Sequence, residues 1–147
     1  MICIKTKKVR DGAKLPVTAS KTAAGADLHA CLGYDLVTIA CHRTLKIPTG
    51  LAMEIPEGYF GAIFARSGLA TKSGLRPANC VGVIDSDYRG EVIVALHNDT
   101  DETRIIENGE RIAQIVILPC QSMNFVETDE LSDTERGGGG FGSSGKK

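Results

Sequence analysis

Short stretches of apolar residues, or of alternating apolar and polar residues, follow one another along this chain. Several run over about four to eight residues, the length typical of strands, and Gly, Pro, Asn or Asp separates most of them. The expected strands are residues 2–9, 27–30, 34–39, 51–55, 59–64, 91–97, 103–106 and 112–118. Residues 56–58 and 98–101 have the composition of turns, and only residues 67–73 favour a helical turn or two. The pattern therefore predicts an all-β sandwich or barrel.

The composition is that of one soluble domain. The 147 residues are 42% hydrophobic and 24% charged, which are ordinary values for a globular domain with one core. The 17 basic and 18 acidic residues nearly cancel, so a broad basic face for nucleic acid is not expected, whereas a local phosphate site is compatible with this charge balance. No apolar run approaches the roughly 20 residues of a membrane span, and the N-terminus lacks the order of a signal peptide. We therefore expect a cytoplasmic protein without a membrane partner.

The cysteines and histidines do not form a metal-binding pattern. Five cysteines are scattered without a C-x-x-C pair or zinc-ligand spacing, so we expect reduced thiols in the core or at the surface. The histidines have spacings that suggest no ligand set, and we expect structural or surface roles for them. These residues are Cys3, Cys31, Cys41, Cys80, Cys120, His29, His42 and His97.

The last dozen residues differ in composition from the rest. A glycine-rich run cannot bury enough apolar surface to order itself, so we expect a β domain over residues 1–135 and a flexible arm over residues 136–147. Arg136 and Phe141 lie within the glycines of this arm. A guanidinium suits a phosphate and an aromatic ring suits a flat base, so the arm is a candidate for binding both.

Four segments of the β region carry polar residues that suit chemistry. Asp85 and Asp87 lie two residues apart between β-like stretches, so a strand would place both carboxylates on one face, near the ring of Tyr88. Two acids beside a ring suggest a base directed at a sugar-bearing substrate. A polar hairpin tip is the structural alternative for this segment.

The other three segments are weaker signals when each is taken alone. Arg66, Ser67 and Gly68 follow an expected strand and suit an anion through charge, a hydroxyl donor and close backbone approach. Asp27 follows a glycine turn, where turn chemistry explains it equally well. Gln114 lies in an apolar strand, where a satisfied structural amide is the usual case.

Five segments in this order resemble the five motifs of the trimeric dUTPase family. They read AGADL, ARSGLA, GVIDSDYRGE, GERIAQIVILP and RGGGGFGSSG, and with them the resemblance covers essentially the whole chain. It implies a jelly-roll-like β barrel with a flexible C-terminal arm, assembled as a homotrimer whose active sites lie between subunits. It also implies a Mg²⁺-dependent hydrolysis of dUTP to dUMP and pyrophosphate, which keeps uracil out of DNA and supplies dUMP for thymidylate synthesis.

The resemblance also implies roles for individual residues in the chemistry. Asp85 matches the catalytic carboxylate that deprotonates a water aimed at the α-phosphorus. Arg66, Ser67 and Gly68 match the phosphate-binding segment. Asp27 and Gln114 match residues that hold Mg²⁺-bound waters or the α-phosphate, without direct metal ligation.

Recognition of uracil and deoxyribose is implied for the segment from residue 79 to residue 88, which is expected to be a hairpin. Asn79 and the backbone near Val83 and Ile84 would pair with the uracil edge, and Tyr88 would stack under the deoxyribose and exclude a 2′-hydroxyl. From the arm, Phe141 would cover the uracil. The arm residues expected to hold the γ-phosphate are Arg136, Gly142, Ser143 and Ser144.

Two rival functions are compatible with such a scaffold. A dCTP deaminase would need a glutamate in the strand that follows residues 79–88, at the position where this chain has Ala95. A non-catalytic nucleotide-binding module would have lost Asp85, Arg66 or the arm, and this chain keeps all three. The sequence therefore favours a catalytic dUTPase.

Overall fold

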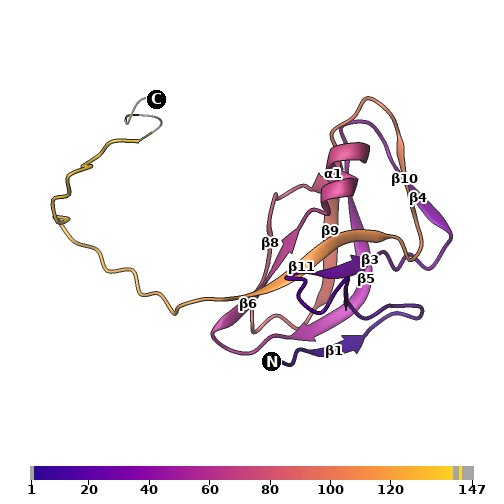
Figure 1. The fold of residues 1–147 in the computed structure, drawn as a ribbon, viewed down its shortest axis with the longest axis horizontal. Helices are drawn as coiled ribbons and strands as arrows, with labels where there is room; N and C mark the ends of the chain where they lie inside the picture. The colour runs from indigo at the N-terminus through magenta and orange to yellow at the C-terminus, as the bar shows by residue number, and fades with distance from the viewer. Residues whose placement is uncertain (1, 141–142, 144–147) are drawn as a thin grey trace.

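A computed structural model describes residues 2–140 and residue 143, and apart from one short helix its regular secondary structure consists of strands (Figure 1). Phe141, Gly142 and Ser144, which were expected to bind substrate, lie outside the described residues. The elements are β1 (Lys5–Lys8), β2 (Val17–Thr18), β3 (Ala26–His29), β4 (Leu36–Ile39), β5 (Thr44–Glu54), β6 (Tyr59–Phe64), α1 (Ser67–Ser73), β7 (Leu75–Pro77), β8 (Gly82–Ile84), β9 (Glu91–Asn98), β10 (Arg104–Glu107) and β11 (Arg111–Pro119).

Two antiparallel sheets enclose the core, and a third, two-stranded sheet extends from them. The strand orders are β1-β5-β9-β7, β2-β3-β11-β6-β8 and β10-β4. Strand β9 alternates buried and more accessible positions, as a strand with one face on a core should. The fully buried side chains come from both large sheets and include Leu28, Ile47, Leu51, Val92, Leu96 and Ile112. The prediction of an all-β fold is confirmed.

The pattern of apolar residues located several elements at their observed bounds. Residues 59–64 form β6 and residues 67–73 form α1, as expected. The helix ends at Gly74, which has φ of 64° and donates its N–H to the Ala70 carbonyl. This helix of seven residues, the one helix in the described part of the chain, is too short to cross a membrane.

Strand β5 begins at Thr44, seven residues before the expected start at residue 51. Pro48 and Gly50 interrupt the β pattern there, which led the prediction to start too late. The Pro48 carbonyl accepts a hydrogen bond from Cys31 N at 2.8 Å, so this residue directs its backbone groups away from β9. The missing N–H of proline therefore costs no bond between β5 and β9. Strands β2, β7 and β8, with two or three residues each, were too short to predict.

Two expectations for residues 79–88 are wrong. The segment is not a hairpin, because β8 pairs with β6 in the five-stranded sheet while β7 pairs with β9 in the other sheet. Asp85 and Asp87 do not share a strand face, because β8 ends at Ile84 and the chain turns over Ser86 and Asp87. A hydrogen bond from Tyr88 N to the Asp85 carbonyl, 3.2 Å long, closes this turn.

Regular structure ends at Pro119, and the following residues run away from the sheets (Figure 1). Four large apolar side chains of this segment are among the most exposed in the described part of the chain. They are Met123, Phe125, Val126 and Leu131, with 75–88% of their surface accessible.

Candidate active site

Two arginines converge on one carboxylate where three strands of the five-stranded sheet meet. Asp27 lies on β3, opposite Gln114 of β11, and Gln114 lies opposite Phe64 of β6. Arg66 follows β6 and donates Nε to Asp27 Oδ1 at 2.8 Å, while Arg111 lies 3.2 Å from Asp27 Oδ2 through Nη1. One carboxylate cannot neutralise two guanidiniums, so this group keeps a net positive charge that suits an anionic ligand.

One end of the Gln114 side-chain amide is hydrogen-bonded, and the other end lies close to a glycine. Its Nε2 donates to the Ala65 carbonyl at 2.9 Å. Its Oε1 lies so close to Gly25 that a Cβ there would approach it to 2.5 Å. Gly25 thus leaves room for the Gln114 amide. We call Asp27, Arg66, Arg111 and Gln114 the Asp27 cluster.

The Asp27 cluster borders a polar hollow of about 320 Å³, which Gly25 and Ser67 also line. Ser67 is exposed at the start of α1, and the neighbouring Gly68 has open space where a side chain would be. The structure therefore brings together four of the residues expected to bind phosphates or their hydrated metal ion. These four are Asp27, Arg66, Ser67 and Gln114.

Arg111 belongs to this hollow but was not among the expected site residues. It lies three positions before Gln114, and in a regular strand two such residues face opposite sides. A bulge between Arg111 and Ala113 shifts the register of β11 against β3, and both Arg111 and Gln114 consequently line the hollow. A strand pattern gives no signal for such a bulge.

His29 lies two residues from Asp27 on β3 and opposite Arg111 in the register. Burial lowers the pKa of His29 below its ordinary value, and the positive charge of Lys14 lowers it further. Its Nδ1 is buried without a hydrogen-bond partner among the described residues. A neutral imidazole therefore lies beside the two guanidiniums of the Asp27 cluster.

A second set of expected site residues lies on and around β8. Asp85 is exposed directly after this strand, and Asn79 and Val83 are also exposed. Tyr88 folds back so that its hydroxyl donates to the Glu91 carbonyl at 3.0 Å. We call residues 79–91 the Asp85 segment. Within the described residues, no hydrogen bond or ion pair joins this segment to the Asp27 cluster, so one chain presents two separate groups.

Of the site residues expected in the arm, the structure describes Arg136 and Ser143. Arg136 Nε donates to the Gly139 carbonyl at 2.8 Å, and the Ser143 N–H donates to the Gly140 carbonyl at 3.0 Å. Both bonds are local to the arm, which lies away from the sheets in Figure 1. In this single chain the described residues of the arm therefore form no hydrogen bond with the Asp27 cluster or the Asp85 segment.

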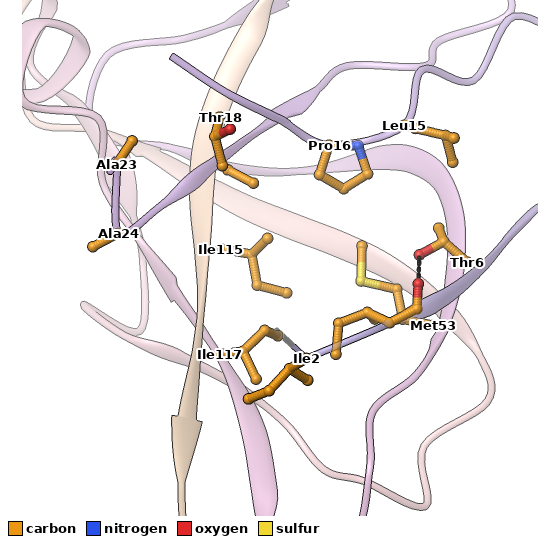
Figure 2. Close-up of a pocket in the computed structure, with 12 residues that line it drawn as sticks. Ile2, Thr6, Leu15, Pro16, Thr18, Ala23, Ala24, Met53, Ile115 and Ile117 are labelled. Atoms are coloured by element: carbon orange, nitrogen blue, oxygen red, sulfur yellow. Dashed lines mark hydrogen bonds between the residues drawn. The ribbon is translucent and has the colours of Figure 1, made fainter. Parts of the chain in front are cut away.

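A second, apolar hollow of about 620 Å³ shares Ala23 and Ala24 with the polar one. Figure 2 shows side chains that line it. Ile115 and Ile117 of β11, Met53 of β5 and Ile2 point into it, and Ala24 borders both hollows. Ile2 and Leu15 of this lining are exposed, whereas Met53 and Ile115 belong to the buried core.

Comparison with known proteins identifies the family. A family model described as dUTPase matches residues 11–145. A deoxyuridine 5′-triphosphate nucleotidohydrolase of Desulfitobacterium hafniense is 54% identical over 133 residues, which cover 90% of this chain and 87% of that protein. The dUTPase of Staphylococcus bacteriophage 80alpha, solved with dUPNHPP, is 31% identical, with a TM-score of 0.89 and 99% of each chain covered.

A further structure extends the likeness in fold. The dUTPase of phage phi11 of S. aureus, for which the coordination of a structural Mg(II) ion is described, is 24% identical. It has a TM-score of 0.78, with 88% of this chain and 98% of that chain covered. On the family match and the 54% identity, this chain belongs to the dUTPase family.

Proposed function

We propose that this chain hydrolyses dUTP to dUMP and pyrophosphate, which keeps uracil out of DNA and supplies dUMP for thymidylate synthesis. The observation that carries the proposal is the convergence of Arg66 and Arg111 on Asp27 beside Gln114, in a chain 54% identical to a named dUTP nucleotidohydrolase. Positioning and charge neutralisation are the main demands of phosphoryl transfer, and this cluster suits both.

The Asp27 cluster and the start of α1 are the proposed phosphate site. Arg66 keeps Nη atoms free of the hydrogen bond that its Nε makes to Asp27, so its guanidinium can bind an oxyanion while its orientation is fixed. The Ser67 hydroxyl and the open backbone at Gly68 lie next to it. Because the orientation of Arg66 is already fixed, this side chain would not need to rearrange when charge develops on the triphosphate.

Asp85 is the proposed general base, which accepts a proton from the water that attacks the α-phosphorus. Its carboxylate is exposed after β8, at the edge of the sheet where a nucleotide can reach it. A positioned base contributes typically about 10²–10⁴-fold to such a reaction.

Asn79, Val83, Ile84 and Tyr88 of the Asp85 segment are the proposed site for the nucleoside. Asn79 and the backbone of Val83 and Ile84 offer donors and acceptors for the uracil edge, where a mismatched base would leave polar groups unpaired. The exposed ring of Tyr88 is proposed to stack under the deoxyribose. The arm, residues 136–147, is proposed to close over the bound nucleotide, with Phe141 on the uracil and Arg136, Gly142, Ser143 and Ser144 at the γ-phosphate. A base–aromatic stack is worth about 1–3 kcal/mol.

Mg²⁺ is the proposed cofactor, and the donors around the polar hollow fit an ion held through its waters. Each oxygen of Asp27 accepts one hydrogen bond from an arginine and keeps lone pairs for a water, and Gln114 Oε1 is a further acceptor. The described residues contain no group of three His, Cys, Asp or Glu side chains that could bind a metal directly. When bound, Mg²⁺ would neutralise phosphate charge while keeping several waters, as it usually does.

A homotrimer with active sites between subunits is the proposed assembly, and cytoplasm is the proposed compartment. The Asp27 cluster and the Asp85 segment are not joined by a hydrogen bond or ion pair among the described residues of one chain. This separation supports a site that a second copy of the chain completes. The apolar hollow in Figure 2 and the exposed apolar residues after β11, such as Phe125, are surfaces that an assembly would bury. The five cysteines are free, as suits a reducing compartment. Light scattering should give three times the chain mass of 15.6 kDa.

The test is pyrophosphate release with Mg²⁺ from dUTP, dTTP, dCTP and UTP, each measured separately. Turnover should be confined to dUTP, and Asp85→Asn should lower kcat by about 10²–10⁴-fold. Asp87→Asn is the matched control, because it removes an exposed carboxylate two residues away that has no proposed role, and it should retain activity. Binding of dUTP without pyrophosphate release would favour a non-catalytic nucleotide-binding module instead.

A further inference from the structure

Tyr88 folds back over Gly90, its neighbour two residues later. The Tyr88 hydroxyl donates to the Glu91 carbonyl at 3.0 Å, and the ring lies against Gly90. A Cβ built on Gly90 would lie 2.6 Å from Cζ of this ring and would meet the hydroxyl oxygen as well. Any side chain at position 90 would therefore have to move the ring.

The backbone gives no reason for a glycine at position 90. Gly90 does not have the positive φ that makes glycine necessary at Gly50 or Gly74. Gly90 is exposed, and the three atoms nearest to a Cβ there all belong to Tyr88. The space that glycine leaves is thus used by Tyr88.

Both ends of Tyr88 are fixed by groups that are themselves anchored. Arg89 Nη1 donates to the Tyr88 carbonyl at 3.0 Å and to the Ser86 carbonyl at 2.6 Å, so it spans the turn that carries Asp87. The carboxylate of Glu91, whose carbonyl accepts from the Tyr88 hydroxyl, binds Arg10 at 2.6 and 2.9 Å and Gly50 N at 2.8 Å. The ring consequently has one defined position although it is exposed.

We propose, on the basis of the function proposed above, that Gly90 is a specificity-determining residue that sets the position of the Tyr88 ring against the sugar. A ring that lies low over Gly90 leaves room for a 2′-hydrogen and meets a 2′-hydroxyl. A methyl group at position 90 displaces the ring, and the site then loses its preference for deoxyribose. Arg89 is the positioning residue that fixes the backbone of Tyr88 for the same purpose.

The experiment compares kcat/KM for dUTP and for UTP in the wild type, Gly90→Ala, Tyr88→Ala and the double variant. Gly90→Ala should lower the ratio of kcat/KM for dUTP to kcat/KM for UTP by about tenfold or more. In the Tyr88→Ala background the same change should have no further effect on the ratio, because contacting residues are not additive. Competition by dUMP and UMP provides the same ratio from binding alone.

The possible outcomes separate the inference from the proposed function. An equal loss for dUTP and UTP in Gly90→Ala, or a further drop of the ratio in the Tyr88→Ala background, would overturn the role of Gly90. No turnover of dUTP by the wild type would instead reject the proposed function. If Gly90→Ala does not fold, Arg89→Ala is the second variant, because it releases the Tyr88 carbonyl without adding an atom. Arg89→Ala should lower the same ratio, and an unchanged ratio in this variant would also overturn the inference.

Discussion

The Asp27 cluster and the Asp85 segment present their polar groups in different ways. In the cluster, the hydrogen bonds join residues far apart in sequence, such as Asp27 with Arg66 and with Arg111, and sheet pairing holds them together. In the segment, the bonds of Tyr88 and Arg89 stay within three residues. The fold therefore assembles the proposed phosphate site within one chain, whereas the loop after β8, which carries Asp85 and Tyr88, is exposed and is held mainly by local bonds. Such a loop needs a ligand or another subunit to become half of an enclosed site.

The largest expected effect comes from removing the arm, whose described residues form no hydrogen bond or ion pair with either region in the single chain. Deletion of residues 136–147 should lower kcat/KM for dUTP by at least about 10²-fold, because a nucleotide bound between the two regions would lose its cover and its γ-phosphate contacts. The circular dichroism spectrum should not change, since the last strand ends at Pro119. Deletion of residues 146–147 alone is the control and should retain activity. Full turnover by the longer deletion would remove the arm from the account.

Two glycine-to-alanine substitutions should separate the two regions. A Cβ on Gly25 would lie 2.5 Å from Gln114 Oε1, so Gly25→Ala should displace this amide and break its bond to the Ala65 carbonyl. We expect kcat/KM to fall by about tenfold for dUTP and UTP alike, since the change affects the phosphate side. Gly90→Ala should instead change the ratio between the two nucleotides. A changed ratio in Gly25→Ala would mean that the regions do not divide their tasks in this way.

A smaller effect concerns stability and the anchor of the Asp85 segment. The hydrogen bonds from Arg10 and from Gly50 N lower the pKa of the half-buried Glu91, although burial acts in the opposite direction. An acid with a lowered folded pKa adds stability above its unfolded value, about 4.5, and loses it as the pH falls through the folded value. Glu91→Gln should therefore lower the urea midpoint at neutral pH. The difference from the wild type should shrink as the pH falls below about 4.5, the unfolded pKa.

The ion pair of Lys5 with Glu54 provides a matched control for this measurement. Its hydrogen bond also lowers the pKa of Glu54, but both partners are largely exposed, so Glu54→Gln should change the midpoint little at any pH. An effect of Glu54→Gln as large as that of Glu91→Gln would show that the anchor of the Asp85 segment has no special weight.

The alternation of apolar residues and the turn residues between them were sufficient to predict the all-β fold, and β6 and α1 at their bounds. They failed where one residue breaks the period. Pro48 hid the first half of β5, and the turn after Ile84 separated Asp85 from Asp87. The bulge before Ala113 brought Arg111 to the polar hollow against its spacing. The resemblance to a family supplied roles for single residues, but contacts between distant strands, such as those of Asp27, become visible only in the fold.

We propose that Asp85 of one subunit works with Arg66 of another, and a mixed trimer tests this pairing most directly. Asp85→Asn and Arg66→Ala chains, each inactive alone, are co-expressed with different affinity tags and purified over both. In a cyclic trimer containing both chains, one of the three shared sites is intact, so about a third of wild-type turnover should return. If both residues served the same site within one chain, every site would keep one defect, and the mixed trimers would remain inactive.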